Sequence, residues 1–256
     1  DNSLEYSADG FMVSNGGKQV IFNAFLSTLD PGDEVVVPAP YWVSYPLIAR
    51  MFGATPVFVT CREEDGFRLR ADALAAALTP RTRWVVLNFP NNPTGAVCQQ
   101  DDLEDIAKVL RDYPDVWILS DEIYEHLVFD GVRAASIAAV APDLKARTIT
   151  LNGVSKAYAM TGWRVGFAGG PADLLTAMRG VQGNATSGVC SIAQAAAVAA
   201  LDGPTDLVRE MAAVYSRRRT LVVEALRGVP GPTDREGGGE GKRGEHGGGR
   251  TRRKQK

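Results

Sequence analysis

The sequence predicts an α/β fold in which a mostly parallel β-sheet is covered by helices on both faces. Short runs rich in β-branched residues recur along the chain, and segments whose apolar residues have helical spacing lie between them. Strands that alternate with helices in this way pair in parallel, because each helix returns the chain to the same edge of the sheet. The runs contain few polar residues, which is typical of strands buried on both faces.

The strands are expected where these runs occur. The five main ones are EVVVP at residues 34–38, VFVT at 57–60, WVVLN at 84–88, WILS at 117–120 and TITL at 148–151. A shorter strand-like segment, FMV at residues 11–13, precedes them.

Three of the segments between the strands have clear helical signals. Residues 18–29 place Val20, Phe25 and Leu29 near one face, and the turn DPGD ends this helix. Residues 43–52 form a second helix that ends at Gly53, with Pro46 in its first turns, where proline is tolerated. Residues 101–113 begin with acidic residues and end with basic ones, as the helix dipole favours.

Composition excludes several classes of protein. The 256 residues are 45% hydrophobic and 23% charged, as in ordinary globular proteins, and the net charge of −2 gives no special attraction to nucleic acid or membranes. No apolar run approaches the roughly 20 residues that a membrane span needs. Cys61, Cys98 and Cys190 lack the spacing of metal ligands, and an odd number argues against a disulfide framework. We expect no metal site and a cytoplasmic location.

A change of composition near residue 227 divides the chain. Residues 1–227 are expected to form one large domain that is truncated at both ends. Residues 228–256 are rich in Gly, Arg and Lys and contain almost no apolar residues, so they cannot build a core. We expect this segment to be a disordered tail that is not native to the domain.

The residues that follow the predicted strands point to one site. In parallel sheets, ligands bind outside the carboxyl ends of the strands. The groups expected at this edge are Tyr41 and Trp42, Asn92 in the PNNPTG turn, Asp121 and Tyr124, Lys156, and the glycine-rich helix start SNGGKQ at residues 14–19. Each has a purely structural alternative. The glycines could form a plain turn, Asp121 could cap a helix, Asn92 could serve turn chemistry, Trp42 could be core, Lys156 could be solvated, and Arg164 could be a surface ion-pair partner.

Pyridoxal phosphate is a cofactor that would use all of these groups together. Its aldehyde condenses with a lysine amine. A carboxylate beside the pyridine nitrogen keeps that nitrogen protonated, so the ring can accept electrons. Asparagine and tyrosine suit its phenolic oxygen, and an aromatic side chain can stack on the ring. The phosphate favours a helix N-terminus and an arginine.

The motifs resemble those of the class I/II aminotransferases. Residues 153–166, GVSKAYAMTGWRVG, are similar to the family's lysine signature. The motifs NGGKQ, PAPYWVSYP, NNPTGAV and LSDEIYE occur in the order found in that family's bacterial aspartate aminotransferases. The resemblance covers roughly residues 6–227 and implies the large domain of a fold type I, pyridoxal-phosphate-dependent transferase.

The resemblance implies roles for five residues around the cofactor ring. Lys156 is expected to form the Schiff base with the cofactor and to move the proton, and Asp121 to pair with the pyridine nitrogen. Tyr124 and Asn92 are expected to bind the phenolic oxygen. Asn92 is also expected to contact the substrate carboxylate, and Trp42 to stack on the ring and help the substrate dock.

The resemblance also implies the phosphate contacts. Gly17, Lys18 and Arg164 are expected to hold the phosphate. Family members often have a serine three residues before the lysine, where this chain has Gly153, so one hydroxyl contact is lost. Ser155 is a possible replacement.

The expected function is transfer of an amino group from an amino acid, with aspartate foremost, to a 2-oxo acid. An alternative keeps the chemistry with prephenate or aromatic substrates, and another is a truncated remnant that binds the cofactor without catalysis. A cofactor-sensing transcription regulator is disfavoured because no basic recognition helix is visible. The arginine that clamps the substrate α-carboxylate in relatives has no counterpart motif here, so we expect weak or absent activity.

The resemblance further implies a homodimer for the intact protein. Residues 183–194 are similar to the stretch that reaches into the neighbouring subunit's site, and Ser187 is the expected phosphate contact across that interface. The apolar helix expected over residues 191–201 could equally belong to the core.

Overall fold

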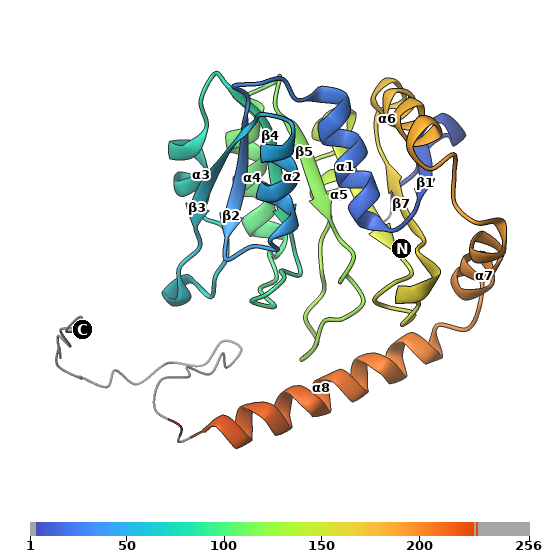
Figure 1. The fold of residues 1–256 in the computed structure, drawn as a ribbon. Helices are drawn as coiled ribbons and strands as arrows, with labels where there is room; N and C mark the ends of the chain where they lie inside the picture. The colour runs from blue at the N-terminus through green and yellow to red at the C-terminus, as the bar shows by residue number, and fades with distance from the viewer. Residues whose placement is uncertain (1–3, 228, 230–256) are drawn as a thin grey trace, which may run out of the picture.

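The computed structural model describes residues 4–227 and 229. In this part of the chain a seven-stranded sheet forms the centre of the molecule, in the order β1-β7-β6-β5-β4-β2-β3 (Figure 1). The strands are β1 (Phe11–Ser14), β2 (Glu34–Ala39), β3 (Thr55–Thr60), β4 (Thr82–Asn88), β5 (Trp117–Asp121), β6 (Thr148–Gly153) and β7 (Gly166–Gly169). Strands β3, β2, β4, β5 and β6 are parallel, and β7 is antiparallel to both β6 and β1. The predicted fold class is therefore confirmed.

Helices cover both faces of the sheet. They are α1 (Gly17–Thr28), α2 (Ser44–Met51), α3 (Ala71–Ala77), α4 (Gln100–Arg111), α5 (Ile137–Val140), α6 (Ala172–Ala185), α7 (Ser191–Leu201) and α8 (Asp206–Leu226). Helices α1, α2 and α6 contribute buried residues to one core cluster, and α3, α4 and α5 to another. The three helices with clear sequence signals lie within about two residues of their expected bounds.

Successive residues of the central strands enter different cores, which explains their apolar runs. Val35 and Val37 of β2 pack with α1 and α2, whereas Val36 between them packs on the opposite face. In β4, Trp84 likewise packs in the first core cluster and the next residue, Val85, in the second. Side chains alternate across a strand, so a strand buried on both faces needs apolar residues at every position.

Strand β7 was not predicted. Its sequence GFAG contains two glycines and no β-branched residue, so local propensity gives no signal. It forms because Gly166 pairs with Gly153 of β6 and with Ser14 of β1, which places it between two strands. The strand therefore depends on its neighbours, which local sequence does not reveal.

The last two helices lie outside the main layers. Helix α7 buries Ala193 and Ala197, but Ile192 and Val198 on the same helix are exposed, so this helix is only partly core. Helix α8 runs below the other elements in the view of Figure 1, and Val208 is its one buried residue.

The predicted boundary at residue 227 falls at the end of α8. The predicted tail, residues 228–256, lies outside the described residues apart from Val229. The disorder and origin of this segment stay predictions. No helix among the described residues has the length and apolar character needed to cross a membrane.

Candidate functional site

A cavity of about 320 Å³ lies where β4, β5 and β6 end and α1 begins. All eight residues chosen from the sequence line it: Gly17, Lys18, Trp42, Asn92, Asp121, Tyr124, Lys156 and Arg164. Three of these segments reach the same edge because β4, β5 and β6 are parallel neighbours, with Asn88 of β4 opposite Asp121 and Asp121 opposite Leu151 of β6. The structure thus brings the predicted groups together, whereas their individual roles stay predictions.

Asp121 ends β5 and lies in the interior, 4% exposed. Its Oδ2 accepts a 2.7 Å hydrogen bond from the Tyr45 hydroxyl, and its Oδ1 accepts a 3.3 Å bond from the Ile123 amide. Burial raises the pKa of the carboxyl group to about 6, against the lowering effects of these bonds and of the Lys156 charge. A turn follows Asp121 rather than a helix, so this side chain is not a helix cap.

Tyr45 belongs to the site and was missed by the sequence analysis. The sequence favoured Tyr41, because it directly follows β2, but Tyr41 stacks on Phe58 with ring centroids 4.9 Å apart and does not line the cavity. Tyr45 lies one helical turn further on, in α2, where its side chain is fully buried. Burial and the nearby Asp121 carboxylate raise the pKa of its hydroxyl well above the usual value. The sequence feature that could have identified Tyr45 is a tyrosine at a core-facing position of the predicted helix over residues 43–52.

Asn92 and Tyr124 lie together beside Lys156. The Asn92 side-chain amide donates a long hydrogen bond of 3.4 Å to the Tyr124 hydroxyl. The Lys156 ammonium lies 5.4 Å from the centroid of the Tyr124 ring. Within the described residues it makes no ion pair or hydrogen bond, although its side chain is half-buried. A half-buried lysine without a polar partner is available for chemistry.

Trp42 and Lys18 form the outer wall of the cavity. The Lys18 ammonium lies 5.0 Å from the centroid of the Trp42 ring, a cation–π contact. The Trp42 ring meets the Tyr45 ring edge-on, with centroids 5.4 Å apart. Trp42 packs against the core with part of its surface and also lines the cavity. It is therefore both a partly buried core residue and a candidate site residue.

The start of α1 and Arg164 also line the cavity. Gly16 caps α1 with a φ of +81°, and no side chain bonds the first amide groups of the helix. Arg164 donates from its guanidinium to the Thr161 carbonyl at 2.8 Å. It forms no ion pair with any described residue, which does not support the surface ion-pair alternative. Unbonded amide groups and a cation together favour an anion.

The position three residues before Lys156 has no room for a side chain. A Cβ atom at Gly153 would lie 2.9 Å from the Val165 carbonyl oxygen and 3.1 Å from the Gly166 Cα. Glycine is therefore required by the close approach of β6 and β7. Ser155, the possible replacement, is buried and lines the cavity.

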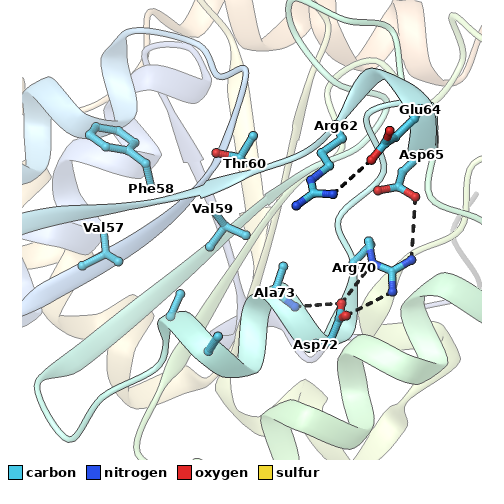
Figure 2. A pocket seen from close by; sticks show the side chains of 12 residues that line it. Val57, Phe58, Val59, Thr60, Arg62, Glu64, Asp65, Arg70, Asp72 and Ala73 are labelled. Atoms are coloured by element: carbon cyan, nitrogen blue, oxygen red, sulfur yellow. Dashed lines mark hydrogen bonds and ion pairs between the residues drawn. The ribbon is translucent and has the colours of Figure 1, made fainter.

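A larger hollow of about 740 Å³ lies elsewhere, between β3 and α3 (Figure 2). Its charged groups pair with one another: Arg62 with Glu64 at 3.0 Å, and Arg70 with Asp72 at 3.0 Å and Asp65 at 3.7 Å (Figure 2). None of the predicted site residues lines it. Because these charged groups are already paired with one another, few of them are available to bind a ligand. The smaller cavity is therefore the better candidate site.

The stretch of residues 183–194, which is expected to reach a neighbouring subunit, lies near the start of α1. Asn15 donates to the Gly188 carbonyl at 3.2 Å, and Gln19 donates to the Thr186 hydroxyl at 2.9 Å. Ser187, between these two contacts, is exposed with a φ of 60°. Its contact with a partner subunit stays a prediction.

Comparisons with known proteins agree on one family. A model of the family described as aminotransferase class I and II matches residues 1–234. The chain is 52% identical over 231 residues to an aspartate aminotransferase of Rhizobium meliloti, covering 90% of this chain and 56% of the relative. It is 49% identical over 233 residues to an aspartate/prephenate aminotransferase of Cereibacter sphaeroides, covering 91% of this chain and 58% of the relative. The chain thus spans little more than half the length of these relatives.

Solved structures give the same result. The crystal structure of the Rhizobium meliloti aspartate aminotransferase superimposes with a TM-score of 0.87 at 52% identity, covering 88% of this chain and 56% of that one. The Thermus thermophilus aspartate aminotransferase with maleate gives 0.82 at 42% identity, covering 88% and 59%. An aromatic aminotransferase of Pyrococcus horikoshii gives 0.85 at 39% identity, covering 88% and 61%.

Proposed function

The chain belongs to the class I and II aminotransferases, and on this basis we propose that its cavity takes part in transferring an amino group from an amino acid to a 2-oxo acid. Pyridoxal 5′-phosphate is the cofactor of this family. Bound in the site, it supplies an aldehyde that joins an amine and a ring that withdraws electrons from the substrate's α-carbon. The remaining requirements fall on the protein's own residues.

The residues present fit this cofactor. The observation that carries the proposal is the buried Asp121 carboxylate in the same cavity as a lysine amine that has no polar partner among the described residues. A buried carboxylate is costly unless a cation meets it, and a protonated pyridine nitrogen is such a cation. Tyr45 holds Oδ2 of Asp121 at 2.7 Å, which orients the carboxylate without neutralising it.

Lys156 is proposed to join the cofactor and to carry the proton at the substrate's α-carbon. Its amine lies on the Tyr124 side of the cavity, and no described residue competes for it. The Asn92 amide and the Tyr124 hydroxyl, 3.4 Å apart, are proposed to donate to the phenolic oxygen of the ring. Trp42 is proposed to cover the ring and exclude water from one face.

Gly17, Lys18 and Arg164 are proposed to bind the phosphate. The first amide groups of α1 are not capped by a side chain, and the Arg164 guanidinium lies against the Gly16 backbone. Backbone amide groups and an arginine suit the oxygen atoms of a phosphate. Ser155 is proposed to supply a further hydroxyl, because the Gly153 position cannot hold one.

Aspartate is proposed as the amino donor, and 2-oxoglutarate as the acceptor. The names of the relatives point to aspartate, with prephenate in some of them. Prephenate is therefore the second substrate to test.

Borohydride reduction tests the proposal directly. The purified chain is mixed with pyridoxal phosphate, reduced and digested, and its peptides are analysed by mass spectrometry. Labelling on Lys156 alone, lost in Lys156→Ala but kept in Lys108→Ala, is the expected result, because Lys108 is exposed and paired with Asp105. Scattered labelling in a folded protein would contradict the proposal. A coupled assay with aspartate and 2-oxoglutarate then measures turnover, for which weak activity stays our prediction.

We also propose that the intact protein is a homodimer. Val43, Leu47 and Met51 are exposed at four-residue spacing along α2, directly after Trp42. Apolar stripes of this kind are typical of interaction surfaces. A cytoplasmic location remains a prediction that rests on the free cysteines Cys61, Cys98 and Cys190.

A further inference from the structure

Asn88 is a buried polar residue that the sequence analysis did not select. It is the last residue of β4, lies opposite Asp121 of β5, and is 4% exposed. Its side chain also reaches the wall of the candidate cavity. A buried amide must satisfy both its donor and its acceptor, so its partners show what it holds in place.

The two ends of the Asn88 amide bind two separate segments of the site. Its Nδ2 donates to the Asp121 carbonyl oxygen at 3.1 Å, and its Oδ1 accepts from the Asn92 backbone amide at 2.9 Å. This assignment is the one that both partners allow, because a carbonyl needs a donor and an amide needs an acceptor. A single side chain thus ties the end of β5 to the PNNPTG turn.

The connection closes into a ring of contacts among residues that line the cavity. Asn92 reaches Tyr124 through its side chain at 3.4 Å, and Tyr124 lies three residues after Asp121 on the same turn. The ring therefore runs from Asp121 through Asn88 and Asn92 to Tyr124 and back along the backbone. The Asn92–Tyr124 contact also joins these two turns, but at 3.4 Å it is a long hydrogen bond.

We propose that Asn88 is a positioning residue, which fixes the distance between the Asp121 carboxylate and the Asn92–Tyr124 donor pair. These groups are proposed to bind two different positions of one rigid cofactor ring, its nitrogen and its phenolic oxygen, so their separation has to match that ring. The inference about the cofactor rests on the proposed function, but the coupling of the two turns is a property of the protein alone. Asn88 itself acts through its neighbours.

The coupling is tested in the ligand-free chain by amide hydrogen exchange. Asn88→Ala is expected to speed exchange at least about fivefold in both segments 89–97 and 121–127, because both lose a common anchor. Asn91→Ala is the matched control: Asn91 lies in the same turn and bonds Thr94 and Pro40, but not Asp121. It is expected to affect segment 89–97 alone. An Asn88→Ala effect confined to segment 89–97 overturns the inference. Asn88→Ser replaces Asn88→Ala if the latter does not fold.

The consequence for the site is tested with pyridoxal phosphate added. Asn88→Ala is expected to weaken the binding of pyridoxal phosphate about tenfold. It is also expected to raise the pH midpoint of the bound cofactor's absorbance change, because hydrogen-bond donors at the phenolic oxygen lower the proton affinity of the nitrogen that joins the cofactor to Lys156. Asn91→Ala is expected to change neither. An Asn88→Ala midpoint equal to that of the control overturns the role at the site.

A double variant separates this role from general damage. If Asn88 acts through Asn92, Asn88→Ala adds little to the midpoint shift of Asn92→Ala, whereas independent effects add up and contradict the inference. Failure of the proposed function has a different signature: the unaltered chain shows no label on Lys156. In that case the exchange experiment still decides whether Asn88 couples the two turns.

Discussion

The Arg164 guanidinium lies in the space that a side chain at Gly16 would occupy. A Cβ atom built at Gly16 would lie 2.3 Å from Nη2 and 2.9 Å from Cζ of Arg164. The missing side chain of the glycine thus allows the arginine to reach the start of α1. This contact brings together two segments that are far apart in sequence, at the proposed phosphate site.

Gly16→Ala is expected to weaken pyridoxal phosphate binding at least about tenfold, because the methyl group displaces Arg164 from the start of α1. Gly32→Ala is the matched control, since Gly32 also has a positive φ of +98° but has no atom within 4 Å of its added Cβ. Both variants carry the cost of a strained backbone, and only the first disturbs the arginine. Equal affinities in a fluorescence titration would contradict the proposed phosphate site.

Tyr45→Phe is expected to destabilise the ligand-free protein by about 1–3 kcal/mol, because Oδ2 of the buried Asp121 loses its partner. The hydroxyl also lowers the pKa of Asp121, so its loss raises that pKa further and weakens pyridoxal phosphate binding. Tyr41→Phe, a change in the same segment that does not reach Asp121, is expected to leave both nearly unchanged. Denaturant unfolding and cofactor titration measure the two effects. Matching results for the two variants would refute this role.

Asp121→Asn is expected to change how stability depends on pH. The pKa of Asp121 is raised to about 6 from 3.8, so the folded state binds the proton more tightly than the unfolded state. The free-energy cost of holding an ionised Asp121 in the folded protein is absent below about pH 4 and grows as the pH rises. It reaches its full value of about 3 kcal/mol above about pH 6. The unfolding free energy of the ligand-free parent protein should therefore fall by about this amount relative to the variant between pH 4 and pH 7. A difference that stays constant over this range contradicts the prediction.

Leu47→Glu combined with Met51→Glu is expected to shift self-association toward the monomer, because it places charges on the exposed apolar stripe of α2. Sedimentation velocity measures the change over a concentration series. Leu221→Glu, at an equally exposed position on α8, serves as the control. A monomeric parent protein, or a dimer unaffected by the α2 changes, would exclude this surface.

The sequence by itself determined the type of fold and selected eight residues that line the candidate cavity. Strand residues such as 84–87 are apolar at every position, and α4 carries its charges in dipole order, so both signals are local and survive without tertiary contacts. The groups that follow each strand could be placed at one edge because parallel strands all end there. Lys156 and Asp121 could be selected from the sequence in this way.

The tertiary structure decided which side chains support those groups. Tyr45 and Asp121 are 76 residues apart, and Asn88 and Asp121 are 33 apart, so their hydrogen bonds depend on helix placement and strand register. Strand β7 likewise exists because two neighbours pair with it. Local propensity depends on residues that are near in sequence. Buried polar contacts instead form between hydrogen-bond donors and acceptors that folding brings together from distant parts of the chain, so local sequence does not reveal them.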